Sequence, residues 1–176
     1  MKTIIRALAF APLLALSALS FAGTTGKDTS AYHHYLRGLL LESQGNFQSA
    51  RDEITRALEL APDSGYLHRT AAELSLRLGQ VNRAADEIER ANELDPKDVK
   101  SLILAGQIHW ALGNAEKAEA KLKKAVAIAP DEAEATVSLA GAVTPRDPKQ
   151  AIQLYQNFLQ RHPGDIEIWE RLAQLY

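Results

Sequence analysis

The chain has 176 residues, which is enough for one domain of ordinary size or one short repeat array. Hydrophobic residues make up 46% and charged residues 24% of the sequence, a globular composition, and abundant alanine with few aromatic residues favours helices over sheets. The formal net charge of −2 argues against nucleic-acid binding, and the absence of cysteine excludes disulfides, zinc–thiolate sites, iron–sulfur clusters and thiol nucleophiles.

Residues 1–22 have the pattern of a cleavable secretory signal peptide. Two basic residues precede an apolar run over residues 7–19, and small residues stand at the positions that a signal peptidase reads. We therefore expect cleavage between Ala22 and Gly23 and a periplasmic or secreted protein. The alternative is a retained membrane anchor, but the apolar run is shorter than the roughly 20 residues that span hydrocarbon.

The next segment, residues 23–30, is polar and glycine-rich, and it predicts a flexible linker. From residue 31 onward the sequence repeats with a period of 34 residues, and such a period indicates a protein built of repeated structural units. The repeating columns are Pro62, Pro96 and Pro130; Gly45, Gly79 and Gly113; Ala50, Ala84 and Ala118; and the small residues Gly38, Ala72, Gly106 and Ala140.

Each column has a physical reason. Every period contains two apolar blocks with helical spacing, and glycine between them allows the left-handed conformation that ends a helix. A small residue on the first helix lets the second helix approach closely, and proline ends the second helix. Asp63, Asp98 and Asp131 stand after the prolines, where an aspartate can cap the next helix.

These columns resemble the tetratricopeptide repeat family, and Trp169, Leu172, Ala173 and Tyr176 match the opening pattern of its repeat. The resemblance implies an all-α fold, a right-handed α–α superhelical solenoid of helix-turn-helix repeats. We place repeats at residues 31–64, 65–98, 99–132 and 133–165, followed by the first helix of a partial fifth repeat at residues 166–176.

The fourth repeat departs from the pattern, because Pro145 and Pro148 replace the glycine turn. We expect a shortened first helix and a stiffer turn there. The final segment, residues 166–176, carries an apolar stripe with little polar cover, which predicts either further repeats or self-association at that end.

No motif for phosphate, dinucleotide or metal binding or for a nucleophilic serine occurs, so we expect no enzyme activity, cofactor or metal. His34, His68 and His109 fall where the family carries bulky packing residues, so a structural role is expected for them. His33 and His34 are neighbours on different helix faces, too few for a metal site.

In the family, fixed places on the first helices line a concave groove that binds peptides. The matching residues are Tyr32, Tyr35 and Leu39 in the first repeat, Tyr66, Arg69, Glu73, Leu76 and Arg77 in the second, and Ile103, Gln107 and Trp110 in the third. Tyrosine, tryptophan and arginine are enriched in binding hot spots. Some of these rings could instead pack between helices, Tyr32 and Trp110 first among them.

Family members that grip the C-terminal carboxylate of heat-shock chaperones carry lysine and asparagine where this chain has Tyr35 and Leu39, so co-chaperone activity is not expected. By analogy, the resemblance implies a non-catalytic scaffold or adaptor of the bacterial cell envelope, serving assembly of a secretion, pilus or polysaccharide-export complex. Two alternatives stay open: the repeat region of a larger enzyme or export channel, and a periplasmic holdase chaperone.

Overall fold

The computed structural model describes residues 26–176, so the predicted signal peptide lies outside the described residues. The first helices of the repeats are α1 (Gly26–Ser43), α3 (Gly65–Arg77), α5 (Val99–Ala111), α7 (Ala133–Val143) and α9 (Ile166–Ala173). The second helices are α2 (Phe47–Leu60), α4 (Val81–Leu94), α6 (Ala115–Ile128) and α8 (Pro148–Arg161). Because α1 begins at Gly26, the prediction of a flexible linker over residues 23–30 is wrong from Gly26 onward: this polar segment extends the first helix.

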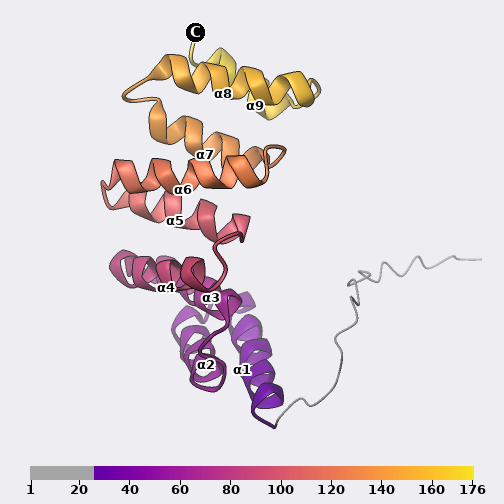
Figure 1. Ribbon diagram of the computed structural model, residues 1–176. Helices are drawn as coiled ribbons and strands as arrows, with labels where there is room; N and C mark the ends of the chain where they lie inside the picture. The colour runs from indigo at the N-terminus through magenta and orange to yellow at the C-terminus, as the bar shows by residue number, and fades with distance from the viewer. Residues whose placement is uncertain (1–25) are drawn as a thin grey trace, which may run out of the picture.

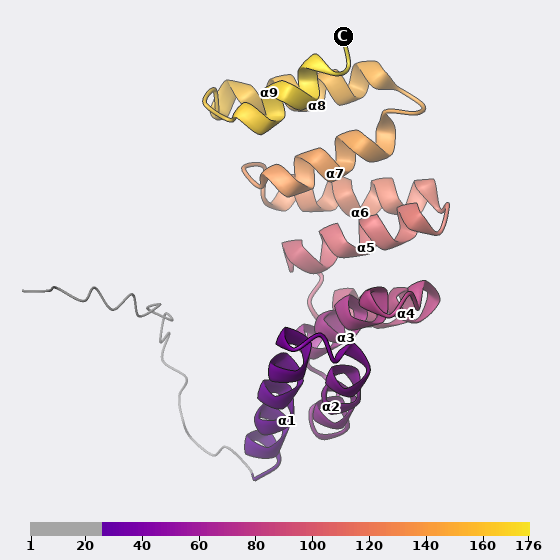
Figure 2. The ribbon, with the colours of Figure 1, turned by 180° about the vertical axis from the view of Figure 1, so that it is seen from behind.

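The helices stack in chain order into a right-handed solenoid, from α1 and α2 at one end to α8 and α9 at the other (Figure 1). Each second helix packs against the first helix before it and the first helix after it. The reverse view shows the helix axes turning gradually along the stack (Figure 2). The all-α solenoid predicted from the repeat columns is confirmed.

The turn glycines allow these hairpins to form. Gly45, Gly79 and Gly113 have φ angles of 77°, 72° and 75°, a left-handed conformation that glycine adopts without strain. In the first turn the amide of Asn46 donates to the carbonyl of Leu41 at 2.9 Å, which closes the end of α1. The glycine column thus ends α1, α3 and α5, as the sequence predicts.

The small-residue column sets the distance between paired helices. A Cβ atom built on Gly106 of α5 would lie 2.4 Å from Cγ of Leu122 on α6. A Cβ atom on Gly38 of α1 would lie 2.9 Å from Cδ1 of Ile54 on α2. Glycine is therefore required at Gly106 for close approach of the second helix.

Helix capping follows the prediction at one of three aspartates. The carboxylate of Asp98 accepts from the amide of Lys100 at 3.3 Å and caps α5. Ser64 caps α3 instead of Asp63, and Asp131 lies one residue before Glu132, the N-cap of α7. Asp131 instead lies 2.9 Å from the guanidinium of Arg161 on α8.

The fourth repeat has the expected shortened first helix. α7 contains 11 residues, whereas α3 and α5 contain 13 each. Pro148 begins α8, where its missing amide hydrogen is no loss, and the carboxylate of Asp147 caps this helix by accepting from the amide of Gln150 at 3.0 Å. The proline turn therefore replaces the glycine turn without breaking the hairpin.

The core is a series of local clusters along the stack, as the stacking of short repeats requires. Ile54 and Leu74 lie in the first cluster, Ile88 and Ile108 in the second, and Leu122 belongs to the largest, which extends from α5 to α9. Between residues 26 and 176, no helix has both the length and the hydropathy to cross a bilayer.

Candidate functional site

A cluster of three tyrosines and one arginine lies where α1 meets α3. We call Tyr32, Tyr35, Tyr66 and Arg69 the tyrosine cluster. The ring centroids of Tyr32 and Tyr35 are 6.3 Å apart, and those of Tyr35 and Tyr66 are 5.4 Å apart in an edge-to-face arrangement. The guanidinium of Arg69 lies 5.0 Å from the centroid of the Tyr66 ring.

The tyrosine cluster borders a hollow in the protein surface. This hollow has a volume of about 360 Å³ and is lined by Ala31, Tyr32, Tyr35, Ser64, Tyr66 and Leu67. Tyr32 is 62% exposed and Tyr66 is 50% exposed, so their rings remain available to a ligand. Most of the lining is aromatic or aliphatic, which suits an apolar side chain of a bound peptide.

Charges beside the hollow are mostly neutralised within the protein. Nη1 of Arg69 lies 3.5 Å from Oε1 of Glu73, and Nε of Arg69 lies 3.4 Å from Oδ2 of Asp98. Burial raises the pKa of the Glu73 carboxyl, and Arg69 partly opposes this effect. Burial and the hydrogen bond with Tyr66, whose hydroxyl lies 2.5 Å away, raise the pKa of the Tyr35 hydroxyl, so the Tyr35 ring stays neutral in the physiological range.

A second hollow lies further along the stack, between α5 and α7. It has a volume of about 250 Å³ and is lined by Gln107, Trp110, Leu122, Ser138, Gly141 and Ala142. Trp110 is 42% exposed at this site. The amide nitrogen of Gln107 donates to Oγ of Ser138 at 3.1 Å, which joins the two helices beside the hollow.

Ten of the eleven residues predicted for the groove retain some exposure. Leu39, Glu73, Arg77 and the rings of Tyr32 and Trp110 are exposed, whereas Leu76 is half-buried against the core. The prediction for Ile103 is wrong: this side chain is 3% exposed and belongs to the largest core cluster. Its place on α5 turns it toward α7, whereas Tyr35 at the equivalent place on α1 remains half-buried.

Sequence reasoning missed the part of this surface that α7 supplies. Ser138, Gly141 and Ala142 line the second hollow, but the irregular fourth repeat obscured the register on which the prediction depended. Gly141 stands at the place in its repeat that Leu39, Glu73 and Gln107 occupy in theirs, counted forward from residue 133. That count alone would have identified it.

The histidines have the structural role expected of them. Nδ1 of His34 lies 2.7 Å from Oε2 of Glu53, and Nδ1 of His68 lies 2.8 Å from Oε2 of Glu87, the same pair one repeat later. Nε2 of His109 lies 2.7 Å from Oε1 of Glu89. Residues 26–176 contain no group of three or more side chains arranged to hold a metal ion.

Family models of the tetratricopeptide repeat match residues 14–65, 41–108, 99–132 and 142–175, which together cover most of the chain. A search of curated protein sequences found no match.

Among solved structures, the chain is similar to MamA, with a TM-score of 0.75 at 18% identity over 84% of this chain and 81% of that one. It is also similar to Pseudomonas aeruginosa pilF, with a TM-score of 0.73 at 21% identity over 86% of this chain and 69% of that one. The first tetratricopeptide domain of Spaghetti (RPAP3), solved with an HSP90 peptide, gives a TM-score of 0.65 at 22% identity over 67% of this chain and 94% of that one. With the four family matches and the helical pairs, these results establish that the chain belongs to the tetratricopeptide repeat family.

Proposed function

We propose that this protein is a non-catalytic scaffold that binds a peptide or a helix of a partner protein in the concave groove formed by its first helices. One observation carries the proposal. Large aromatic rings stand exposed on successive first helices, Tyr32 on α1, Tyr66 on α3 and Trp110 on α5, and each borders a hollow. Exposed rings that border apolar hollows are the usual anchors of a protein interface.

The two hollows suit different parts of one elongated ligand. The tyrosine cluster offers mainly ring faces and edges, whereas the second hollow combines the Trp110 ring with the polar groups of Gln107 and Ser138. An extended peptide or a helix could place one apolar side chain in each hollow. Solved neighbours of the same fold support this kind of ligand, because two of them hold peptides from HSP90 and HSP70.

We further propose that the protein acts in a bacterial cell envelope, in the assembly of a secretion, pilus or polysaccharide-export complex. The support is the secretory pattern of residues 1–22, together with a binding surface and no catalytic motif in the sequence. This second proposal concerns the cellular location and pathway of the protein, so a result against it would leave the proposed binding surface unaffected.

Photo-crosslinking in living cells tests the binding surface. A photoreactive amino acid would replace Tyr32 or Trp110 on the first-helix face, or Arg83 or Lys124 as exposed controls on second helices. We expect the same partner to be captured from both positions on the first helices and not from the controls. Capture of that partner from the control positions alone would place the binding surface on the second helices and contradict the proposal.

A further inference from the structure

The junction between α4 and α5 buries polar atoms that have no hydrogen-bond partner. Asn92 on α4 is 7% exposed, and Nδ2 and Oδ1 of its side chain are both unpaired and shielded from solvent. Nδ1 of His109 on α5 is also buried without a hydrogen bond, as is Nε of Arg69, which lies 3.4 Å from Oδ2 of Asp98 at the start of α5. In the described part of the chain only one other side-chain atom, Nε of Arg51, is in this state. The unsatisfied polar atoms therefore gather at one place in the stack.

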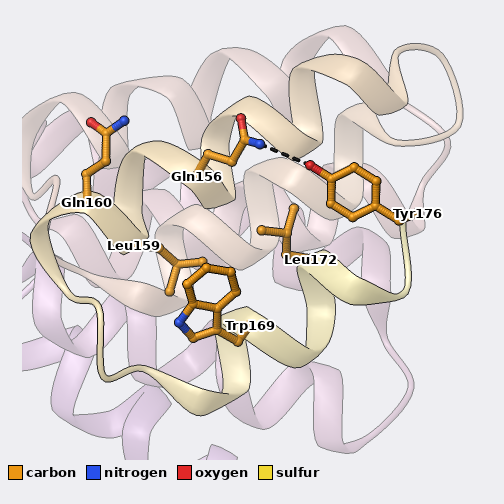
Figure 3. Close-up of a pocket in the computed structure, with 6 residues that line it drawn as sticks. All are labelled: Gln156, Leu159, Gln160, Trp169, Leu172 and Tyr176. Atoms are coloured by element: carbon orange, nitrogen blue, oxygen red, sulfur yellow. Dashed lines mark hydrogen bonds between the residues drawn. The ribbon is translucent and has the colours of Figure 1, made fainter.

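Asn92 stands at a place in the repeat that is otherwise apolar. Counted back four residues from the closing prolines, the equivalent residues are Leu58, Val126 and Leu159. Leu159 on α8 points toward Trp169 of α9 (Figure 3), and it belongs to the same core cluster as Ile168 and Leu172 of that helix. This place therefore faces the next first helix, and Asn92 faces α5.

The α5 side of this junction is polar as well. Ser101 is the third residue of its repeat, and the equivalent residues of the other first helices from α3 onward are Leu67, Ala135 and Ile168. All four are buried, and Oγ of Ser101 donates to Oδ2 of Asp98 at 2.6 Å. The other junctions between repeats thus have apolar side chains at both places, whereas the α4–α5 junction has an amide and a hydroxyl.

These polar groups weaken the closed junction relative to an open one. A buried amide without a partner destabilises the state that buries it, and opening would return the Asn92 amide to water. Two polar contacts cross the junction, His109 with Glu89 and Arg69 with Asp98, but both carboxylates are partly exposed, so water can replace these contacts at small cost. Because each repeat contacts only its neighbours, one weak junction can open while the others stay closed.

We propose that the α4–α5 junction is a hinge, which opens and closes while the helices on both sides of it stay folded. The tyrosine cluster lies on one side of this hinge and the hollow beside Trp110 lies on the other, so opening changes the separation of the two sites. The hinge does not depend on the proposed function, because it follows from the packing of α4 against α5.

Thiol labelling of the purified chain measures this opening, because the chain has no cysteine and a buried thiol reacts only when its surroundings open. Ser101→Cys, a nearly isosteric change, reports on the α4–α5 junction. Ala135→Cys, at the same buried place of the next repeat, is the matched control for the α6–α7 junction. We expect the thiol at position 101 to react at least about tenfold faster than the thiol at position 135.

Exchanging the residues of the two junctions tests the cause. Asn92→Val gives the α4–α5 junction the residue that α6 carries at this place, and Val126→Asn makes the reverse change in the α6–α7 junction. We expect Asn92→Val to slow labelling at position 101 about tenfold and to leave position 135 within about threefold. Val126→Asn should accelerate labelling at position 135 by a similar factor.

Equal labelling rates at positions 101 and 135 overturn the proposal, and so do rates that neither exchange alters. The dependence on urea distinguishes a hinge from unfolding of the whole chain, because local opening exposes little surface and depends only weakly on urea. Labelling at position 101 that depends on urea as steeply as global unfolding does would also overturn the hinge.

Discussion

The packing of α5 against α6 gives a sharp quantitative prediction at Gly106. Replacing a helical glycine with alanine ordinarily stabilises a protein by about 0.5–1 kcal/mol, because alanine loses less backbone entropy on folding. At Gly106 the new Cβ would lie 2.4 Å from Cγ and 2.7 Å from Cδ2 of Leu122. Cγ is the branch point of the side chain, so relief requires a rotamer change of Leu122 or separation of the two helices.

Overpacking of this kind costs about 1–3 kcal/mol. Subtracting the gain in helix propensity, we expect Gly106→Ala to lower the free energy of unfolding by up to about 2.5 kcal/mol. Gly141→Ala in α7 is the matched control, because its Cβ would meet no atom within 4 Å. This control should raise stability by about 0.5–1 kcal/mol. Gly38→Ala should fall between the two, since its nearest contact, at 2.9 Å, is the mobile end of Ile54.

Urea unfolding followed by far-ultraviolet circular dichroism would rank the three variants by their midpoints, which remain comparable even if the repeats unfold in steps. The expected order of stability is Gly141→Ala, then Gly38→Ala, then Gly106→Ala. If Gly106→Ala were as stabilising as Gly141→Ala, the close approach of the paired helices would be refuted.

Two further predictions concern a buried carboxylate and the predicted leader. The hydrogen bond with His34 and the nearby charges of Arg37 and Arg56 hold the pKa of the Glu53 carboxyl below its usual value. The ionised carboxylate therefore stabilises the folded protein at neutral pH, and this stabilisation is lost as the pH falls through the lowered pKa. Glu53→Gln should therefore lower the free energy of unfolding by about 1–3 kcal/mol at pH 7 and by progressively less in acid, whereas Glu59→Gln on the same helix should leave it nearly unchanged. An equal loss of stability in Glu53→Gln at pH 3 and pH 7 would disprove this role of Glu53. N-terminal sequencing of the chain after expression in a bacterium should begin at Gly23 in the periplasmic fraction, and an intact chain retained in the membrane would instead indicate an anchor.

The regular part of the fold could be predicted because each repeating column has one physical purpose. The left-handed backbone of the turn requires glycine, and the short distance between paired helices requires a small residue where they cross. Neither requirement depends on distant parts of the chain. The capping aspartates were less predictable, because Ser64 competes with Asp63 for the end of α3 and the choice depends on the backbone. The start of α1 was missed because polar composition alone does not exclude a helix.

The arrangement of the candidate binding residues could be predicted where the repeats are regular, and their role in binding stays a prediction. Tyr32, Tyr35, Tyr66 and Arg69 meet as their places in the repeat imply. The prediction was wrong for Ile103, because the side chain there follows the local packing of α5 against α7. In the hollow beside Trp110, Gly141 could have been identified by counting from residue 133, whereas Ser138 and Ala142 stand at places of the repeat that the family pattern does not assign to the groove.

The central claim is that the first-helix face binds another polypeptide, and a binding measurement tests it most directly. Once crosslinking has identified the partner, isothermal titration calorimetry would compare its affinity for the parent chain, Tyr66→Ala and Lys124→Ala. Truncating a hot-spot ring costs about 1–2 kcal/mol or more, so we predict that Tyr66→Ala binds at least about tenfold more weakly while its helical content is unchanged. Lys124→Ala on α6 should bind like the parent. Equal affinity of all three proteins would contradict the claim.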